Sequence, residues 1–306
     1  IVSANFLPAS PNKVPLPGYY NLADRGAQLV EDLTQPDVLW NTENSQTVQL
    51  GLQTGYAQRV LAPLLEDLFA IARGNEEKHL VKQLAQWQGD YPVDSYLPTL
   101  FTELSYQLLR AAMLDELGDT VFNNLLNTRI IDSSLPLLAA DPDSPWWNNY
   151  VTKEQQTRQQ VVAQAWQATL LHLRTTFGVD PLDWLWGTAH TLTHHHPLAE
   201  QAPLDRLLNI GSFAAPGGHE IPNNFSSGYS SAPWPVAYGP STRRIIDFAE
   251  PEKSLGINPL GQSGVRFDRH YADQAKAYMR GEYFQQHLSA EDIQRNTQST
   301  LRLLPR

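Results

Sequence analysis

Apolar residues recur at helical spacing through most of residues 20–130. Two runs carry the pattern most clearly: Leu22, Ala23, Gly26, Leu29, Val30 and Leu33, then Leu97, Leu100, Phe101, Leu104, Leu108 and Ala111. Side chains three and four residues apart share one face of a helix, so both runs predict helices that pack against a core. Asn44-Ser45 precedes a further helical pattern and predicts a capped helix start.

Asp, Pro and Asn interrupt this pattern over residues 131–151, most densely in Asp141-Pro142-Asp143-Ser144-Pro145. These residue types favour turns, so this stretch predicts a loop. The helical period returns over residues 152–177 and predicts a long helix that ends at Gly178. Glycine commonly ends a helix because it accepts a left-handed backbone. Residues 20–178 are therefore expected to be mainly helical.

Short β-prone runs bounded by turn residues follow the helical region. They occupy residues 209–213, 221–225, 234–238 and 244–248, so residues 179–270 are expected to be rich in strands and loops. Residues 271–306 return to helix, at about 271–281 and 290–300. Helices followed by strands and closing helices predict an α+β fold with an antiparallel sheet. With no flexible linker in view, residues 1–306 are expected to form a single interdependent unit.

The chain opens on an apolar, strand-like run, Ile1-Val2-Ser3-Ala4-Asn5-Phe6-Leu7-Pro8. Pro8, Pro11, Pro15 and Pro17 block regular helix, so residues 1–19 predict a strand followed by a loop. No methionine, signal peptide or charged leader precedes this run. We therefore expect the chain to be the C-terminal piece of a processed or truncated protein.

Composition narrows the classes of function. The 306 residues include 22 basic and 32 acidic ones, a net charge of −10, which argues against a nucleic-acid-binding protein. No apolar run approaches the roughly 18–20 residues that span a bilayer, so no membrane span is expected. The chain has no cysteine, which excludes disulfides, thiolate catalysis and cysteine metal ligands.

A histidine cluster is the most prominent local signal for chemistry: His190, then His194-His195-His196. On a helix, His190 and His194 would share one face, as zinc ligands often do. Thr191, Leu192 and Thr193 lack the glutamate of a metalloprotease motif, and Pro197 limits any helix. The alternative, which we favour, is a polar loop whose histidines hydrogen-bond to the backbone or to solvent.

Other candidates have equally ordinary structural explanations. Gly217-Gly218-His219-Glu220-Ile221-Pro222-Asn223-Asn224 predicts either a catalytic turn or a hairpin with satisfied polar groups. The carboxylate pairs Asp141/Asp143 and Asp180/Asp183 favour turn and cap roles, and Trp184-Leu185-Trp186-Gly187 favours core packing. Gly261-Gln262-Ser263-Gly264 does not match a nucleophile elbow, and no phosphate loop or dinucleotide motif is present.

Five motifs in order resemble the penicillin amidase family, which includes penicillin acylases and acyl-homoserine lactone acylases. They are Trp184-Leu185-Trp186-Gly187-Thr188-Ala189-His190, Gly217-Gly218, Gly239-Pro240-Ser241-Thr242-Arg243 with Asp247, Gly261-Gln262-Ser263-Gly264, and His270-Tyr271 with Asp273-Gln274. The resemblance implies the C-terminal portion of an αββα sandwich of the N-terminal nucleophile hydrolases. Arg243 would be a buried structural arginine.

The opening run carries the functional part of the resemblance. Val2-Ser3-Ala4-Asn5-Phe6-Leu7-Pro8 places Asn5 at the family's catalytic asparagine, and Tyr20-Asn21-Leu22-Ala23-Asp24-Arg25 places Arg25 at its active-site arginine. Family members cleave themselves to expose a serine whose α-amino group acts as general base. Asn5 would donate a hydrogen bond to the oxyanion. Arg25 would orient the site and lower the basicity of the amine through its like charge.

This chain departs from the family because residue 1 is Ile rather than a nucleophile. The resemblance thus implies that the upstream β-chain segment and the α chain of the same precursor supply the nucleophile and most of the acyl pocket. The substrate would be a small N-acyl compound, such as a penicillin or an acyl-homoserine lactone. No cofactor is implied, and the enzyme would be periplasmic or secreted.

The family's structural calcium would draw on residues outside this chain, because no acidic residue lies between Phe6 and Gly18. Two other functions stay open at this point. One is a non-catalytic binding or scaffold relative of the same fold, and the other is a histidine-dependent metallohydrolase.

Overall fold

A computed structural model describes residues 1–8, 14 and 16–305. The chain forms two compact units. The first contains residues 1–36, 51–195 and 211–239, and the second contains residues 37–50, 196–210 and 240–306. The interdependence of residues 1–306 stays a prediction. Of the proline-rich loop, Pro11 and Pro15 lie outside the described residues.

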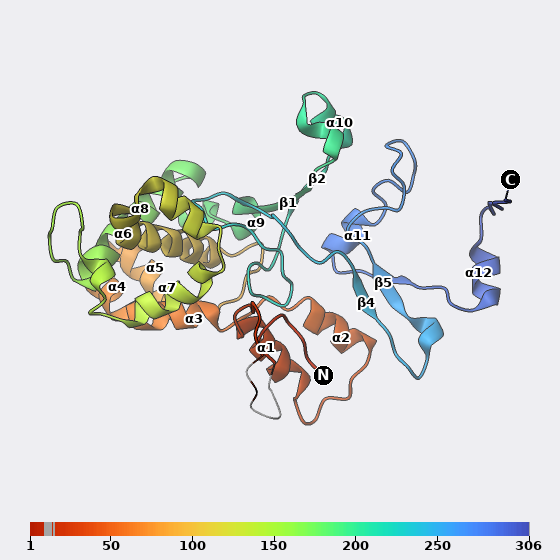
Figure 1. Cartoon of the computed structure of the whole chain (residues 1–306), viewed down its shortest axis with the longest axis horizontal. Coiled ribbons are helices and arrows are strands. Elements are labelled where there is room, and N and C mark those ends of the chain that lie inside the picture. The colour runs from red at the N-terminus through yellow and green to blue at the C-terminus, as the bar shows by residue number, and fades with distance from the viewer. Residues whose placement is uncertain (9–13, 15, 306) are drawn as a thin grey trace. The chain divides into compact units, whose positions relative to one another are not determined.

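Helices dominate the first unit (Figure 1). Their bounds are α1 Asp24–Leu33, α3 Tyr56–Leu61, α4 Leu65–Ile71, α5 Gly74–Gln86, α6 Leu97–Leu126, α7 Ile130–Ala140, α8 Arg158–Phe177 and α9 Trp186–Ala189. Short 3-10 turns span Ala62–Leu64, Pro145–Trp147 and Pro181–Asp183. The expected helical region, residues 20–178, is thus largely helical in the first unit.

The longest helices pack side by side, α6 along α8 and α8 against α4. Leu100, Leu104 and Leu108 of α6 are buried, as their spacing predicts. The helix α8 begins at a capping box of Thr157 and Gln160 and ends at Gly178, whose φ is 129°. The predicted C-terminal end of this helix is therefore correct.

The loop predicted at residues 131–151 is wrong over its first part, where α7 lies. Ile131, Leu135 and Leu138 are buried at helical spacing, so burial outweighs the turn-forming residues. Pro136 falls inside this helix. The Asp- and Pro-rich loop begins only after Ala140.

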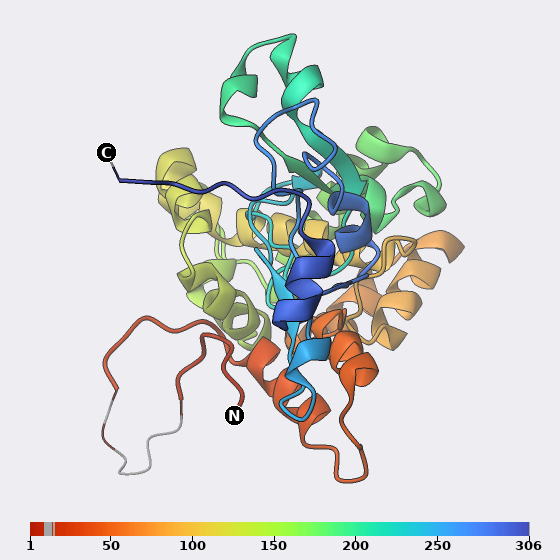
Figure 2. The same cartoon turned by 90° about the vertical axis from the view of Figure 1, so that its right-hand side faces the viewer.

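A three-stranded sheet has the order β2-β1-β3, with β1 at His190–His194, β2 at Ile210–Ala214 and β3 at Trp234–Pro235. The strands β1 and β2 run side by side in both views (Figure 1, Figure 2). The strand β1 pairs with β3 in parallel, His190 opposite Trp234. The antiparallel sheet expected from the sequence is therefore wrong for this pair, because the long connection between the two strands, which contains β2, allows them to run in the same direction.

The second unit contains the antiparallel sheet β4-β5-β6, at Arg243–Ile245, Leu255–Ile257 and Phe284–Gln285. Its helices are α2 Thr42–Gln49, α10 Leu204–Leu208, α11 Ala275–Met279 and α12 Ala290–Asn296, with 3-10 turns at Pro197–Glu200 and Pro251–Lys253. Asn41 caps α2 together with Asn44. Arg243 is buried with its guanidinium over the Tyr278 ring, so its predicted structural role is confirmed.

The strand expected at the start of the chain does not form, since residues 1–8 adopt bends and irregular backbone. A strand needs a neighbour that satisfies its backbone groups, and no strand of the described chain pairs with these residues. Among the described residues, no helix is both long and apolar enough to cross a membrane.

Candidate active site

The two residues that the sequence singles out, Asn5 and Arg25, meet in the first unit. Arg25 lies in the first turn of α1, and its Nη2 donates to the Asn5 side-chain Oδ1 at 2.7 Å and to the Ala4 carbonyl at 3.0 Å. The next residue, Gly26, is buried against the Phe6 ring, which a Cβ at this position would strike. The local sequence therefore brings α1 close enough for Arg25 to reach Asn5.

The Asn5 amide has a defined orientation. Arginine has donors and no acceptor, so the amide atom that faces Arg25 is the oxygen, and the NH₂ group points away from the guanidinium. The φ of Asn5 is 65°, a left-handed conformation that asparagine tolerates better than most residues. The Asn5 carbonyl accepts a hydrogen bond from the Asn21 backbone N–H at 2.9 Å. Side chain and backbone of Asn5 are thus both held.

A third group, Glu220, belongs to the same cluster. Its Oε1 accepts a hydrogen bond from the Asn21 Nδ2 at 3.1 Å, although the two residues are 199 positions apart. Glu220 is only 1% exposed and has a φ of 55°. Burial raises the pKa of its carboxyl above the usual 4.5, against the opposing charges of His219 and Arg25. Asn21 therefore links the Asn5 backbone to a buried carboxyl.

The segment around Glu220 is a turn without regular strand, so the hairpin expected as one alternative for residues 217–224 does not form, and a catalytic role for the turn stays a prediction. Gly217 has a φ of 77°, and a Cβ there would strike the Asn223 carbonyl. The Gly217 carbonyl accepts from the Trp186 indole N–H at 2.9 Å. Residue composition at 217–224 predicted a turn, but no local signal predicted the contact between Glu220 and Asn21.

The polar loop favoured for the histidine cluster is wrong over residues 190–194, which form strand β1, and the alternative helical pair of His190 and His194 does not form either. His190 is buried, stacks on Trp186 with ring centroids 4.4 Å apart, and has its Nδ1 2.8 Å from the Ala215 carbonyl. Burial lowers the pKa of His190 to about 4. Within residues 1–8, 14 and 16–305, no group of three or more His, Cys, Asp or Glu side chains is arranged to hold a metal.

The remaining candidates have structural roles. The Asp141 carboxylate accepts from the Asp143 backbone N–H, and the Asp180 carboxylate accepts from the Leu182 backbone N–H, so both serve in turns or caps. Trp184 and Trp186 are buried in the hydrophobic core. The Ser263 hydroxyl accepts from the Val265 backbone N–H in a turn. The contacts that join Asn5, Arg25, Asn21 and Glu220 therefore mark the candidate site, and the catalytic roles of Asn5 and Arg25 stay predictions.

This chain is similar to a known protein family and to several known acylases. A family model described as penicillin amidase matches residues 1–295. Acyl-homoserine lactone acylase QuiP of Pseudomonas aeruginosa is 25% identical over 243 residues, which are 72% of this chain and 28% of that protein. QuiP of Pseudomonas syringae pv. tomato is 26% identical over 284 residues, which are 87% of this chain and 34% of that protein.

Among solved structures, a thermostable penicillin G acylase from Alcaligenes faecalis matches 100% of this chain and 57% of its own, with a TM-score of 0.58 and 18% identity. At this low sequence identity, the structural similarity supports the fold alone. The chain spans about a third of the length of the curated relatives it matches, 28% and 34% in these two cases.

Proposed function

Because the chain belongs to the penicillin amidase family, we propose that it forms part of an amide hydrolase that cleaves an N-acyl bond. It contributes the oxyanion donor Asn5 and the active-site arginine Arg25. The observation that carries this proposal is the 2.7 Å hydrogen bond between them, which leaves the Asn5 NH₂ group turned away from the arginine.

Amide hydrolysis through a serine passes through a tetrahedral intermediate with a negatively charged oxygen. A donor that is already oriented stabilises this oxygen without reorganising during the reaction. Arg25 supplies that orientation, because its charge-assisted hydrogen bond holds the Asn5 side-chain Oδ1 in place. Asn21 and Glu220 hold the backbone on the other side of Asn5. The NH₂ group of Asn5 is then available to the oxyanion.

The nucleophile in this proposal is an N-terminal serine outside these 306 residues, whose α-amino group is its general base. The much greater length of the relatives supports this part of the proposal. That serine, most of the acyl pocket and the rest of the αββα sandwich come from the upstream β-chain segment and the α chain of the same precursor. The positive charge of Arg25 lowers the basicity of the nearby amine.

The proposed substrate is a small N-acyl compound, with acyl-homoserine lactones first because two relatives carry that activity in their names. Penicillins are the second class, by likeness of fold. The proposed location is the periplasm or the extracellular space. A structural calcium does not fit the described residues, which offer no metal-holding cluster. No step of the reaction uses one here.

The test uses the full-length protein that contains this chain. Amine release is measured from acyl-homoserine lactones and from penicillin G, for the wild type and for Asn5→Ala. The variant should lose about 10²–10³ in kcat, the typical effect of removing one oxyanion donor. Asn127→Ala, a change at an exposed asparagine, should keep full activity.

Two outcomes would contradict the proposal. Unchanged turnover in Asn5→Ala would remove Asn5 from the mechanism. A folded wild type that cleaves none of the N-acyl compounds would favour a non-catalytic relative of the same fold.

A further inference from the structure

His219 connects two parts of the first unit. Its Nε2 lies 2.9 Å from the Asp132 Oδ1 on α7, and its Nδ1 lies 3.3 Å from the Ser226 Oγ. Asp132 and Ser226 are 3% and 0% exposed, respectively, so both partners are fixed in the interior. The imidazole ring is thereby held at both nitrogens. It ties the turn at residues 217–226 to a helix far away in the sequence.

The same turn presents Glu220, the neighbour of His219 in the chain. Glu220 holds the Asn21 side chain, and the Asn21 backbone holds the Asn5 carbonyl. A short series of contacts therefore runs from α7 to the proposed oxyanion donor. A shift of about 1 Å at a reacting group can cost about 100-fold in rate, so small movements of the turn would affect turnover.

The ends of the turn are fixed independently of His219. The Gly217 backbone N–H donates to the Tyr91 carbonyl at 2.9 Å, and the Asn223 backbone N–H donates to the Gly51 carbonyl at 2.9 Å. Both hydrogen bonds join backbone groups, so they do not depend on the side chains of residues 218–222. The contact between His219 and Asp132 therefore restrains the middle of the turn, where Glu220 lies.

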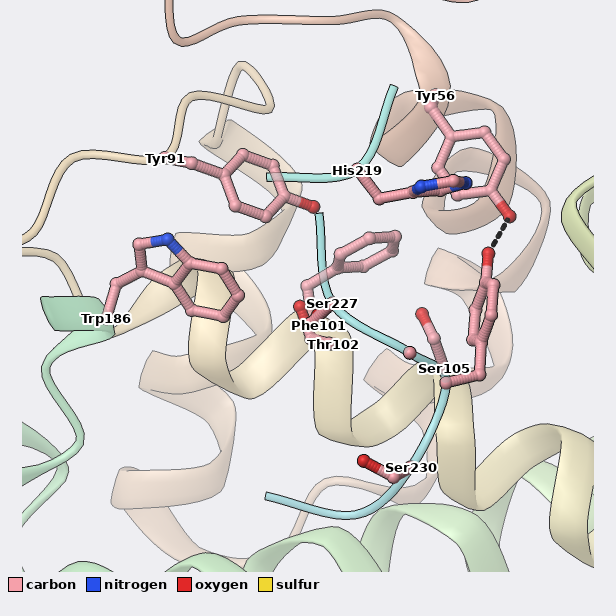
Figure 3. Close-up of a pocket in the computed structure, with 11 residues that line it drawn as sticks. Tyr56, Tyr91, Phe101, Thr102, Ser105, Trp186, His219, Ser227 and Ser230 are labelled. Carbon is pink, nitrogen blue, oxygen red and sulfur yellow. Dashed lines mark hydrogen bonds between the residues drawn. The ribbon is translucent and has the colours of Figure 1, made fainter. Parts of the chain in front are cut away.

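Packing alone does not fix the His219 ring, because the ring borders a cavity of about 60 Å³ (Figure 3). Other walls come from Tyr56, Phe101, Ser105, Trp186 and Tyr229, and the Tyr56 and Tyr229 hydroxyls are hydrogen-bonded across 3.1 Å, the dashed line in Figure 3. A cavity that admits benzene measures about 150 Å³, so this one suits a few water molecules. The Tyr229 ring meets the His219 ring edge-on, with ring centroids 6.1 Å apart, and the hydrogen bonds to Asp132 and Ser226 fix the direction of the two ring nitrogens.

From these contacts we propose that His219, anchored by Asp132, is a positioning residue for the active site. It keeps Glu220 in contact with Asn21 and thereby keeps Asn5 in place. This inference rests on the proposed function for its kinetic readout. His219 itself does not touch the reacting atoms.

The kinetic test compares His219→Gln, Asp132→Asn and Glu220→Leu in the full-length protein, because leucine removes the oxygen that accepts from the Asn21 Nδ2. His219→Gln and Asp132→Asn should each lower kcat about 10- to 100-fold with little change in KM. If His219 acts through Glu220, the double variant His219→Gln/Glu220→Leu should be no slower than Glu220→Leu alone. The matched control is His172→Gln, which removes a contact to the Ala232 carbonyl away from the turn.

A structural measurement tests the inference without activity. In a crystal structure of the full-length His219→Gln protein, the bond between the Asn21 Nδ2 and the Glu220 Oε1, 3.1 Å in the native chain, should be lost. An intact bond, or a folded variant with wild-type kcat, would overturn the positioning role. A wild type without amidase activity would refute the proposed function, and the crystal structure of the variant would still decide this inference.

Discussion

The guanidinium of Arg25 donates to the side-chain oxygen of Asn5 across 2.7 Å. The same Nη2 also donates to the Ala4 carbonyl at 3.0 Å, so one nitrogen holds both the side chain and the adjoining backbone. Arg25 is partly buried, and α1 is held against Phe6 at Gly26. These contacts fix the orientation of the Asn5 side-chain amide in the folded chain. The first prediction concerns this arginine.

Arg25→Lys should lower kcat in the full-length enzyme with little change in KM. Lysine carries a compact charge on a flexible stem and does not reproduce the planar geometry of arginine. A lost hydrogen bond to a charged group is worth about 1.5–3 kcal/mol, which corresponds to a decrease of about 10- to 100-fold. Steady-state kinetics on an N-acyl substrate measure the effect.

Arg174→Lys is the matched control, since Arg174 forms a single ion pair with the exposed Glu76 in the first unit, away from α1. Such pairs contribute about 0–1 kcal/mol, so this variant should keep nearly full activity. Equal losses in the two variants would mean that Arg25 has no special role.

Glu103→Gln should destabilise the first unit. The Glu103 carboxylate is fully buried on α6 and accepts hydrogen bonds from the Gln107 Nε2, the Ser231 Oγ and the Ala232 backbone N–H, at 2.7, 2.7 and 2.8 Å. Glutamine would remove the charge and place an NH₂ group among donors. We expect the free energy of unfolding to fall by about 3 kcal/mol.

Urea unfolding of the purified protein measures this change. Glu31→Gln, at an exposed position on α1, should alter the free energy of unfolding by less than about 0.5 kcal/mol. A Glu103→Gln protein as stable as the wild type would show that the buried carboxylate is not needed.

His190 should remain neutral as the pH falls from neutral to about 4, because burial lowers its pKa to about 4 from the usual 6.5. Between these two values the unfolded chain binds a proton that the folded chain does not. Stability therefore rises with pH in this window: the contribution is fully present above pH 6.5 and is lost as the pH falls toward 4.

The NMR signals of the His190 ring, followed during a pH titration, measure its pKa directly. A His190 that titrates with the usual pKa of 6.5 would contradict the buried, neutral state described here.

Part of this structure follows from the sequence. Helical spacing predicted α6 and α8, and Gly178 predicted where α8 ends, because burial of one helix face leaves a regular local pattern. Asn5 and Arg25 were identified by resemblance within a short stretch of chain. The structure brings the two side chains into contact, and their catalytic roles stay predictions.

The parts that were missed depend on contacts between distant segments. Glu220 meets Asn21 across 199 positions, and β1 meets β3 in a parallel pair, and neither contact leaves a local pattern. The sequence did not predict the helix α7 for a different reason. Some of its residues are typical of loops, namely Asp132, Ser133, Ser134 and Pro136, but its apolar residues are buried. Tertiary packing outweighs such local preferences.

The proposed donor to the oxyanion is the Asn5 side-chain amide, oriented by Arg25. The most direct measurement is a crystal structure of the full-length enzyme with a phosphonate or boronate analogue of the tetrahedral intermediate. The Asn5 Nδ2 should lie about 2.7–3.1 Å from the charged oxygen of the analogue, with Arg25 still bound to the Asn5 Oδ1. An analogue whose charged oxygen is bound by other donors, with the Asn5 amide turned away, would contradict this proposal.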